Sequence, residues 1–245
     1  METINPPPNS PIGIFDSGLG GLTVLKSLET ILPNESFIYF GDTAHVPYGT
    51  KSAETVIRYS QHIMNFFQKH ETKAVVIACN TASAVAFQHL QQLYNIPLFD
   101  VVTPSVEFAI NHTKNKNIGV VGTFSTIYSN AYTKMFQKLG SGCNVKEIAC
   151  PLFVPIIEEG WANTDIAENI AKTYLNEFQN INIDTLILGC THYPIMVNTI
   201  QKVLSNQINL VYSGKTVGIK LKEYLKKQNC ENSSLSSQPA KYFVT

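Results

Sequence analysis

The sequence predicts an α/β protein in which helices cover both faces of parallel sheets. Short apolar runs alternate with amphipathic stretches along almost the whole chain, as is typical of strands joined by crossover helices. Residues 75–78 are apolar at every position, as expected of a strand buried on both faces. Two strand-to-loop junctions also recur later in the chain, which indicates two related halves.

The expected strands are short apolar runs that end at turn-forming or polar residues. They are residues 12–15, 37–40, 74–78, 98–102, 118–121, 145–149, 185–188 and 210–212, with a last edge strand at 241–245. Helices fill the segments between them. Leu22, Leu25, Leu28 and Leu32 share one face of the first helix, and Pro33 ends it. The polar residues 229–238 are expected to form a loop.

The recurring junctions suggest a duplication. Residues 12–17 (IGIFDS) are echoed by 118–123 (IGVVGT), and residues 75–81 (VVIACNT) by 186–192 (LILGCTH). The two pairs are 106 and 111 residues apart, which favours a repeated half of about 105–110 residues over a chance likeness between α/β loops. Two such halves would bring their matching loops face to face across a cleft.

Composition narrows the class of protein. The 245 residues carry 18 Lys+Arg and 18 Asp+Glu, and a net charge of zero argues against a nucleic-acid or membrane partner that depends on net charge. No apolar run approaches the roughly 20 residues of a membrane span, and the first residues do not resemble a signal peptide. The 5 cysteines are odd in number and lack a Cys-x-x-Cys spacing, so neither a disulfide framework nor a metal site is expected.

Chemically active side chains stand at the expected carboxyl ends of strands, where α/β proteins bind ligands. Cys79 and Cys190 occupy matching positions, and a following helix N-terminus would stabilise a thiolate. A free thiol is only a few per cent ionised at neutral pH, so a base such as Asp16 or His192 is needed. The alternative is that both cysteines are small buried hydrophobic residues. The other polar residues at these ends are Ser17, Asn80, Thr81 and Thr191.

Two loops could hold a small anionic ligand. Residues 18–21 (GLGG) resemble a dinucleotide loop, but Thr23 stands where the third glycine is required, so a carboxylate is the expected ligand instead. The loop 41–49, rich in glycine and proline, could wall the same site or be an ordinary surface turn.

Two opposed thiols suit a proton transfer that inverts a carbon centre. One thiolate removes a proton from one face while the other thiol donates a proton to the opposite face, and the roles exchange with direction. Paired thiols could equally serve redox chemistry or acyl transfer, and the residues alone leave these alternatives open.

Several motifs together resemble the glutamate racemases, the cofactor-independent members of the aspartate/glutamate racemase superfamily. The likeness runs from about residue 12 to residue 245. It is carried by 15–24 (FDSGLGGLTV), 41–43 (GDT), 47–49 (PYG), 78–82 (ACNTA), 150–152 (CPL), 154–155 (VP), 158–160 (EEG) and 188–194 (LGCTHYP).

The resemblance implies two Rossmann-like parallel-sheet lobes related by a pseudo-twofold axis, with the active site in the cleft between them. Residues 1–101 and 211–245 would form one lobe, and residues 102–210 the other. It further implies interconversion of L- and D-glutamate without a cofactor, with Cys79 and Cys190 as the two bases. Asp16 would assist Cys79, and His192 would assist Cys190 together with Glu158 or its neighbour Glu159. The implied substrate-binding residues are Asp16, Ser17, Pro47, Tyr48, Gly49, Asn80, Thr81, Thr191 and His192.

The same resemblance implies a homodimer in the bacterial cytoplasm that supplies D-glutamate for peptidoglycan. A regulatory contact with DNA gyrase is thought to occur in some relatives, and nothing in this sequence supports it. The alternatives are a racemase of aspartate or a related acid, or a binding or regulatory protein without activity. The sequence departs from the pattern at 44–46 and at Thr103, both expected near the cleft, and it stops where relatives usually continue into another helix.

Overall fold

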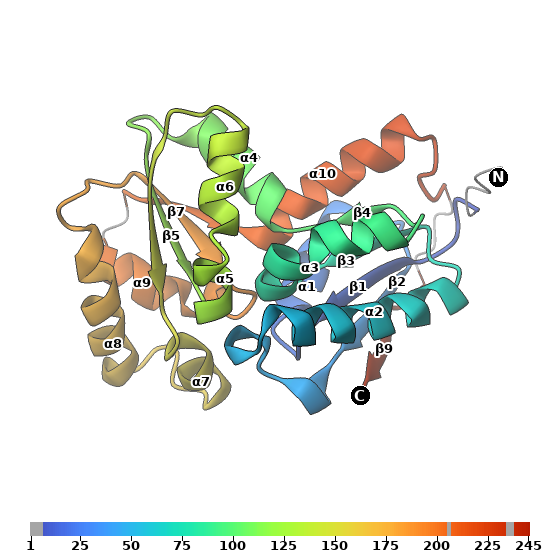
Figure 1. Ribbon diagram of the computed structural model, residues 1–245, viewed down its shortest axis with the longest axis horizontal. Coiled ribbons are helices and arrows are strands. Elements are labelled where there is room, and N and C mark those ends of the chain that lie inside the picture. Colours follow the sequence, from blue (N-terminus) through green and yellow to red (C-terminus); the bar gives the residue numbers. More distant parts are fainter. Residues whose placement is uncertain (1–6, 205–206, 234–237) are drawn as a thin grey trace.

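The first of two sheets contains five parallel strands. A computed structural model describes residues 7–204, 207–233 and 238–245, and Figure 1 shows two lobes side by side, each built on one sheet. The strand order of the first sheet is β4-β3-β1-β2-β9. Its strands are β1 (Ile12–Asp16), β2 (Phe37–Gly41), β3 (Ala74–Ile77), β4 (Leu98–Phe99) and β9 (Lys241–Val244).

The second sheet contains four parallel strands in the order β6-β5-β7-β8. They are β5 (Asn117–Gly122), β6 (Asn144–Ala149), β7 (Thr185–Gly189) and β8 (Asn209–Tyr212). The central strands of both sheets are buried at almost every position. This explains why their sequences are continuously apolar and do not alternate.

Helices cover both faces of each sheet. On the first sheet, α1 (Leu22–Ile31) and α10 (Ser213–Lys227) cover one face, and α2 (Ala53–Lys69) and α3 (Asn80–Leu93) cover the other. On the second, α4 (Val102–His112) and α6 (Ala131–Lys138) lie opposite α8 (Asp165–Leu175) and α9 (Val197–Leu204). The short helices α5 (Phe124–Tyr128) and α7 (Phe153–Glu158) begin close behind the ends of β5 and β6.

The two sheets repeat one topology. The order β4-β3-β1-β2 in the first matches β8-β7-β5-β6 in the second, and β9 has no counterpart. The starts of β3 and β7, of β4 and β8, and of α4 and α10 are each 111 residues apart. The strands that carry the recurring sequence motifs, β1 with β3 and β5 with β7, are neighbours within their sheets. The structure therefore repeats the spacing on which the duplication was predicted.

The two halves exchange their last helices. Helix α4 follows a strand of the first sheet but packs on the second, and α10 follows a strand of the second sheet but packs on the first. The two helices touch each other, with Ser105 Oγ 3.0 Å from Thr216 Oγ1. The lobe boundaries predicted at 101/102 and 210/211 fall near these crossings, and they stay a prediction.

One strand prediction is wrong at its end. Residues 98–102 were expected to be extended, but β4 stops at Phe99 and Val102 begins helix α4. The cause is Asp100, whose carboxylate accepts hydrogen bonds of 2.7 Å from the backbone N–H groups of Val102 and Thr103. Such a cap favours the helix over continuation of the strand.

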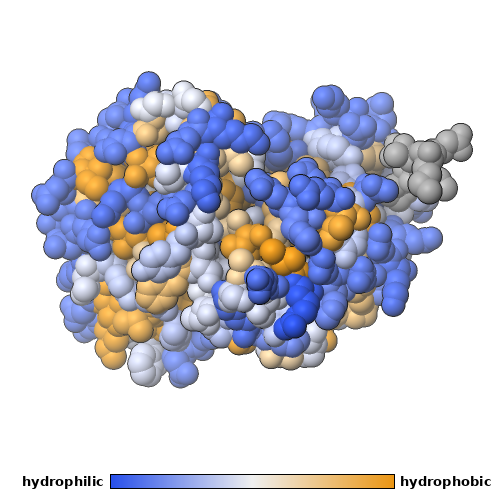
Figure 2. All heavy atoms as spheres, viewed as in Figure 1, coloured by the Kyte–Doolittle hydropathy of each residue, from blue (hydrophilic) through white to orange (hydrophobic). Residues whose placement is uncertain are grey.

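The side of the molecule drawn in Figure 2 has no single dominant apolar area. On the side drawn in Figure 2, apolar residues occur in separate patches among hydrophilic ones over both lobes. Within residues 7–204, 207–233 and 238–245, no helix has the length and apolar character needed to cross a membrane. The predicted loop at 229–238 has no helix or strand from residue 230 to 233, and residues 234–237 lie outside the described part of the chain.

Candidate active site

A pocket lies between the two lobes at the carboxyl ends of both sheets. Its cavity volume is about 30 Å³, room for about two water molecules. The first lobe contributes Ser17, Val46, Pro47, Tyr48, Gly49, Cys79, Asn80 and Thr81, and the second contributes Thr123, Val154, Gly189, Cys190, Thr191 and His192. All the predicted site residues line this pocket except Asp16 and Glu158, which contact residues that do.

Cys79 stands at the junction of β3 and α3. The sharp change from strand to helix makes it the N-cap residue, and the N–H of Ala82 donates to its sulfur at 3.5 Å. The thiol in turn donates to Ser17 Oγ at 3.7 Å. Burial first, and then the nearby charge of Asp16, raise the pKa of Cys79 to about 12 against the lowering effect of these hydrogen bonds. The resting thiol is therefore protonated at neutral pH.

Cys190 occupies the matching position after β7 and has a different set of neighbours. His192 Nδ1 lies 3.8 Å from its sulfur, and His192 Nε2 lies 3.2 Å from Glu158 Oε1 at the end of α7. Burial raises the pKa of Cys190, while the backbone N–H groups of His192 and Tyr193 lower it in part. Thiol, imidazole and carboxylate thus form a chain from the buried pocket to a half-exposed side chain.

Asp16 is fully buried behind the pocket and holds its walls together. Its carboxylate accepts from the N–H groups of Gly18 and Gly21, each at 3.1 Å, and from Thr191 Oγ1 at 3.3 Å across the cleft. Burial raises the pKa of Asp16, and the neighbouring His192 lowers it in part. Its described hydrogen bonds go to the glycine loop and to Thr191 rather than to Cys79, so it acts on that thiol through its charge.

Close contacts require glycine in the loop between β1 and α1, from the second lobe at Gly20 and from the first lobe at Gly21. A Cβ at Gly20 would lie 2.4 Å from His192 Nδ1 and 2.7 Å from Thr191 Oγ1. A Cβ at Gly21 would lie 2.4 Å from Asp16 Cβ. Thr23 Oγ1 also donates to the backbone oxygen of Thr191 at 2.8 Å. This loop therefore packs against the imidazole that lies beside Cys190.

Asn80 lines the pocket and joins the two lobes. Its Nδ2 donates to Tyr132 Oη at 2.9 Å and to Ser213 Oγ at 3.2 Å. Its Oδ1 is buried and has no hydrogen-bond partner among the described residues. A buried unpaired carbonyl is costly unless a ligand satisfies it, and a ligand's ammonium group would do so.

Three threonine hydroxyls form a second link across the cleft. Thr81 Oγ1 lies 3.0 Å from Thr123 Oγ1 and 3.2 Å from Thr126 Oγ1. On the neighbouring loop, Ser125 Oγ donates to the carbonyl of Gly49 at 2.9 Å. The pocket loop of the first lobe is therefore held against α5 of the second.

Four lining residues were absent from the predicted site: Val46, Thr123, Val154 and Gly189. A signal existed for Thr123, because it is the counterpart of Ser17 in the repeated junction. Val154 belongs to the 154–155 motif of the family resemblance, but its place in the pocket depends on the packing of α7. Of the two positions that depart from the racemase pattern, Val46 lines the pocket, while Thr103 lies at the start of α4 and does not.

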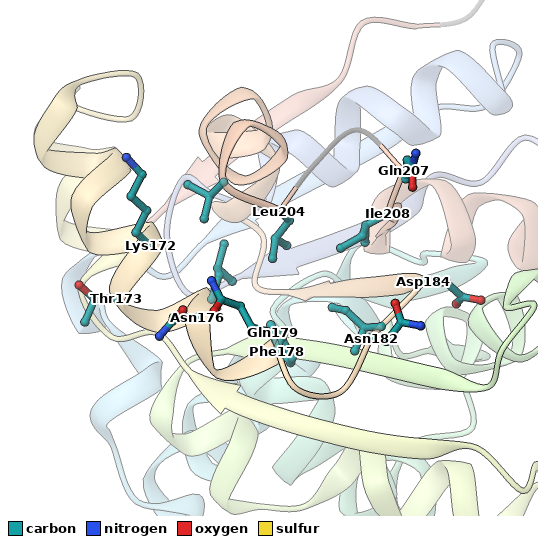
Figure 3. Close-up of a pocket in the computed structure, with 13 residues that line it drawn as sticks. Lys172, Thr173, Asn176, Phe178, Gln179, Asn182, Asp184, Leu204, Gln207 and Ile208 are labelled. Atoms are coloured by element: carbon teal, nitrogen blue, oxygen red, sulfur yellow. The ribbon is translucent and has the colours of Figure 1, made fainter.

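A larger hollow lies elsewhere on the second lobe. It has a volume of about 970 Å³ and is bounded by α8, α9 and the segment before β7, as Figure 3 shows with Lys172, Gln179 and Leu204 among its walls. Asn182 and Asp184 place it at the amino end of β7, whereas Cys190 follows the carboxyl end. The five residues of the strand separate the two by about 17 Å. Ligands of α/β sheets bind beyond the carboxyl ends, so the smaller pocket is the site.

Metal ligands do not gather in this pocket. Among the described residues, no group of three or more His, Cys, Asp or Glu side chains could hold a metal ion. The groups that meet at the pocket are instead two thiols, hydroxyls, an imidazole and backbone amides. Their chemistry is that of proton transfer and of hydrogen bonding to a small polar ligand.

This fold and pocket define a class: two-lobed α/β proteins of the racemase type, in which each lobe brings one thiol to a shared cleft. The chain belongs to the Asp/Glu/hydantoin racemase family, whose model matches residues 12–220.

Its similarity to glutamate racemases is extensive. The chain is 48% identical over 204 residues to a glutamate racemase of Geobacter metallireducens, which covers 83% of this chain and 76% of that one. The glutamate racemase of Francisella tularensis, solved in complex with D-glutamate, has a TM-score of 0.91 at 42% identity, covering 97% of this chain and 89% of that one. A glutamate racemase isoform of Bacillus anthracis has a TM-score of 0.93 at 36% identity, covering 96% and 88%.

Proposed function

We propose that the protein is an isomerase that interconverts L- and D-glutamate by a two-thiol proton transfer. The observation that carries the proposal is the pair Cys79 and Cys190, one thiol from each lobe, at the walls of one pocket. The relatives of similar length are named glutamate racemases, and one was solved with D-glutamate. These similarities favour glutamate over aspartate or a related acid as the substrate.

In the proposed reaction, Cys79 removes the α-proton of D-glutamate while Cys190 donates a proton to the opposite face. The reverse direction exchanges their roles. Because burial keeps both thiols protonated at rest, a thiolate must form when the substrate binds. His192 is within reach of the Cys190 thiol, and its contact with Glu158 stabilises an imidazolium formed by taking that proton.

The substrate groups find complementary partners on the pocket walls. We propose that the orphan Oδ1 of Asn80 accepts from the ammonium group, and that Ser17, Thr81, Thr191 and the loop 47–49 hold the carboxylates. A cavity of about 30 Å³ is too small for this substrate. For the substrate to enter, the two lobes must separate or the loop 46–49 must move away from the pocket. Closure of the lobes around the substrate then excludes water during proton transfer.

The decisive experiment measures α-proton exchange in deuterated water with each glutamate enantiomer and no added cofactor. We expect exchange and racemisation of both, with aspartate much slower in parallel assays. Cys79→Ser and Cys190→Ser should each nearly abolish racemisation, while Cys143→Ser, at a half-buried thiol outside the pocket, should keep it. Wild-type protein that exchanges neither enantiomer would contradict the proposal.

The biological setting rests on the family resemblance. We propose a homodimer that supplies D-glutamate for peptidoglycan in the bacterial cytoplasm. Light scattering after size-exclusion chromatography tests the assembly, with a mass of twice 27.2 kDa expected. A DNA-supercoiling assay tests the gyrase contact, for which the neutral chain offers no electrostatic argument.

A further inference from the structure

Asp42 and Thr245 form a buttress behind the pocket loop. Strand β9 pairs with β2 in parallel register, with Val244 beside Gly41, so the next residue on each strand, Thr245 and Asp42, also lie side by side. Thr245 Oγ1 donates to Asp42 Oδ1 at 3.0 Å and accepts from the N–H of Ala44 at 2.9 Å. The last strand is thereby tied to the first turn of the loop 42–49.

The Asp42 carboxylate passes this constraint on to the pocket. It is buried, and its Oδ2 accepts the hydroxyl proton of Tyr48 at 2.5 Å, while His45 Nδ1 lies 2.7 Å from its Oδ1. Tyr48 is only 1% exposed and lines the pocket beside Gly49. Burial raises the pKa of Tyr48, and its bond to Asp42 adds to the rise, so the phenol keeps its proton and the hydrogen bond persists.

The loop is thus fixed at both ends. On the pocket side, Ser125 Oγ donates to the carbonyls of Gly49 and Lys51, at 2.9 and 3.1 Å. On the far side, His45 stacks on the ring of Tyr59 at 4.0 Å. Between these contacts, the hydrogen bond from Tyr48 to Asp42 ties the pocket loop to the end of β2.

We propose that Asp42 and Thr245 are positioning residues for substrate binding: the last strand holds the Asp42 carboxylate, and Asp42 holds Tyr48 and the pocket loop. This inference rests on the proposed function. Neither residue is among those that line the pocket, so both act through the loop 42–49, of which Tyr48 reaches the pocket. Because the loop binds the substrate in the ground state and the transition state alike, loosening it raises KM more than it lowers kcat.

The first test compares Thr245→Val with Thr245→Ser. Valine keeps the shape but removes the hydroxyl, and we expect KM for glutamate to rise about threefold to tenfold with kcat within about twofold of wild type. Serine keeps the hydroxyl and should restore the wild-type KM. Val244→Thr, at the neighbouring exposed position, is the matched control and should leave both constants unchanged. An unchanged KM in Thr245→Val, or an equal rise in Thr245→Ser, would overturn the proposal.

A double-mutant cycle tests whether Thr245 acts through the hydrogen bond between Asp42 and Tyr48. Tyr48→Phe removes the proton that Asp42 accepts and should raise KM by itself. If Thr245 acts through Tyr48, Thr245→Val has little left to disturb once Tyr48→Phe is present. The double variant should then have a KM less than about twofold above that of Tyr48→Phe. Independent, multiplicative effects of the two substitutions would contradict the path.

Hydrogen exchange separates this inference from the proposed function. Amides of residues 43–49 should exchange faster in Thr245→Val than in wild type or Val244→Thr, whether or not the protein racemises glutamate. Inactive wild-type protein whose variant shows the faster exchange would refute the function and keep the buttress. If the wild-type protein is active and the variant shows no change in exchange or in KM, the proposed function stands and the buttress is refuted.

Discussion

Burial governs the chemistry of the two pocket thiols more than any single charge does. Cys79 and Cys190 are nearly inaccessible, and desolvation is the largest cause of the rise in pKa at each. A thiol in this state is a proton donor, and it becomes a base only when a neighbour takes its proton. In the proposed reaction, the neighbours of each sulfur, Ser17 and Asp16 on one side and His192 on the other, would take or return its proton.

The raised pKa of Cys79 has a measurable consequence for stability. In the unfolded chain the thiol ionises near pH 8.5, whereas in the folded protein it stays protonated up to about pH 12. Its contribution to stability is full below the unfolded pKa and is lost as pH rises toward the folded one. We expect the free energy of unfolding to fall between about pH 9 and pH 11, and to fall less steeply in Cys79→Ser. Identical slopes in denaturant titrations of the two proteins would contradict this.

The close approach at Gly20 predicts a second effect at the scale of one residue. In Gly20→Ala the added methyl group meets His192 Nδ1, so the imidazole must leave its place beside Cys190. We expect kcat/KM for glutamate to fall by about tenfold to a hundredfold, since displacements near 1 Å have such effects. Gly18→Ala is the control, because its nearest contact is Val46 Cγ2 at 3.3 Å. Equal values of kcat/KM in Gly20→Ala and Gly18→Ala, measured by steady-state kinetics, would contradict this prediction.

Among the elements, the ends of strands and helices carry the information that sequence patterns miss. The strand prediction at 98–102 fails because one side chain, Asp100, ends β4 and begins α4. Asp100 is also the residue before the helix that crosses to the second lobe. Its capping bonds therefore determine where the chain leaves one sheet and joins the other.

Loss of this cap should cost stability and spare activity. Asp100→Ala removes both hydrogen bonds to the start of α4, and we expect the free energy of unfolding to fall by about 1–2 kcal/mol. Asp100→Asn keeps an acceptor oxygen and should lose much less. Urea denaturation measures both variants. The prediction fails if Asp100→Ala unfolds at the same urea concentration as wild type.

Much of the fold was predictable because it depends on local periodicity and on short loops. All nine expected strands exist, and the repeated junctions lie on paired strands. The polar residues at strand ends were predictable as lining residues for the same reason. Asp42 and Thr245 were not predictable as partners, because their contact depends on the chain returning about 200 residues later to add β9 to the sheet. Val154 likewise depends on how α7 packs.

At the scale of the whole molecule, one buried ion pair ties together segments from both ends of the chain. Lys73 Nζ lies 2.6 Å from Glu35 Oε2 and donates to the carbonyls of Pro8 and Cys230, at 2.5 and 2.8 Å. Both side chains are almost fully buried. The pair therefore joins the segment before β1, the segments that lead into β2 and β3, and the segment after α10.

Breaking this pair from one side should be severe. Lys73→Met leaves the Glu35 carboxylate buried without its partner, and we expect a loss of about 3–5 kcal/mol in the free energy of unfolding. The double substitution Lys73→Met with Glu35→Met removes both charges and should recover a large part of that loss. Guanidinium denaturation compares the two. A double variant no more stable than Lys73→Met would contradict the account.

Thermodynamics limits the effect that the unlike surroundings of the two thiols can have on the rates of the proposed reaction. Cys79 faces a hydroxyl and Cys190 faces an imidazole, so the two directions of the proposed reaction are free to differ in turnover number and in half-saturating concentration. Enantiomers, however, have equal free energies in an achiral solvent, so their equilibrium constant is one. The Haldane relation then requires kcat/KM to be equal for L- and D-glutamate. Differences between the two lobes can therefore make kcat and KM differ between the enantiomers. They cannot make the ratio kcat/KM differ.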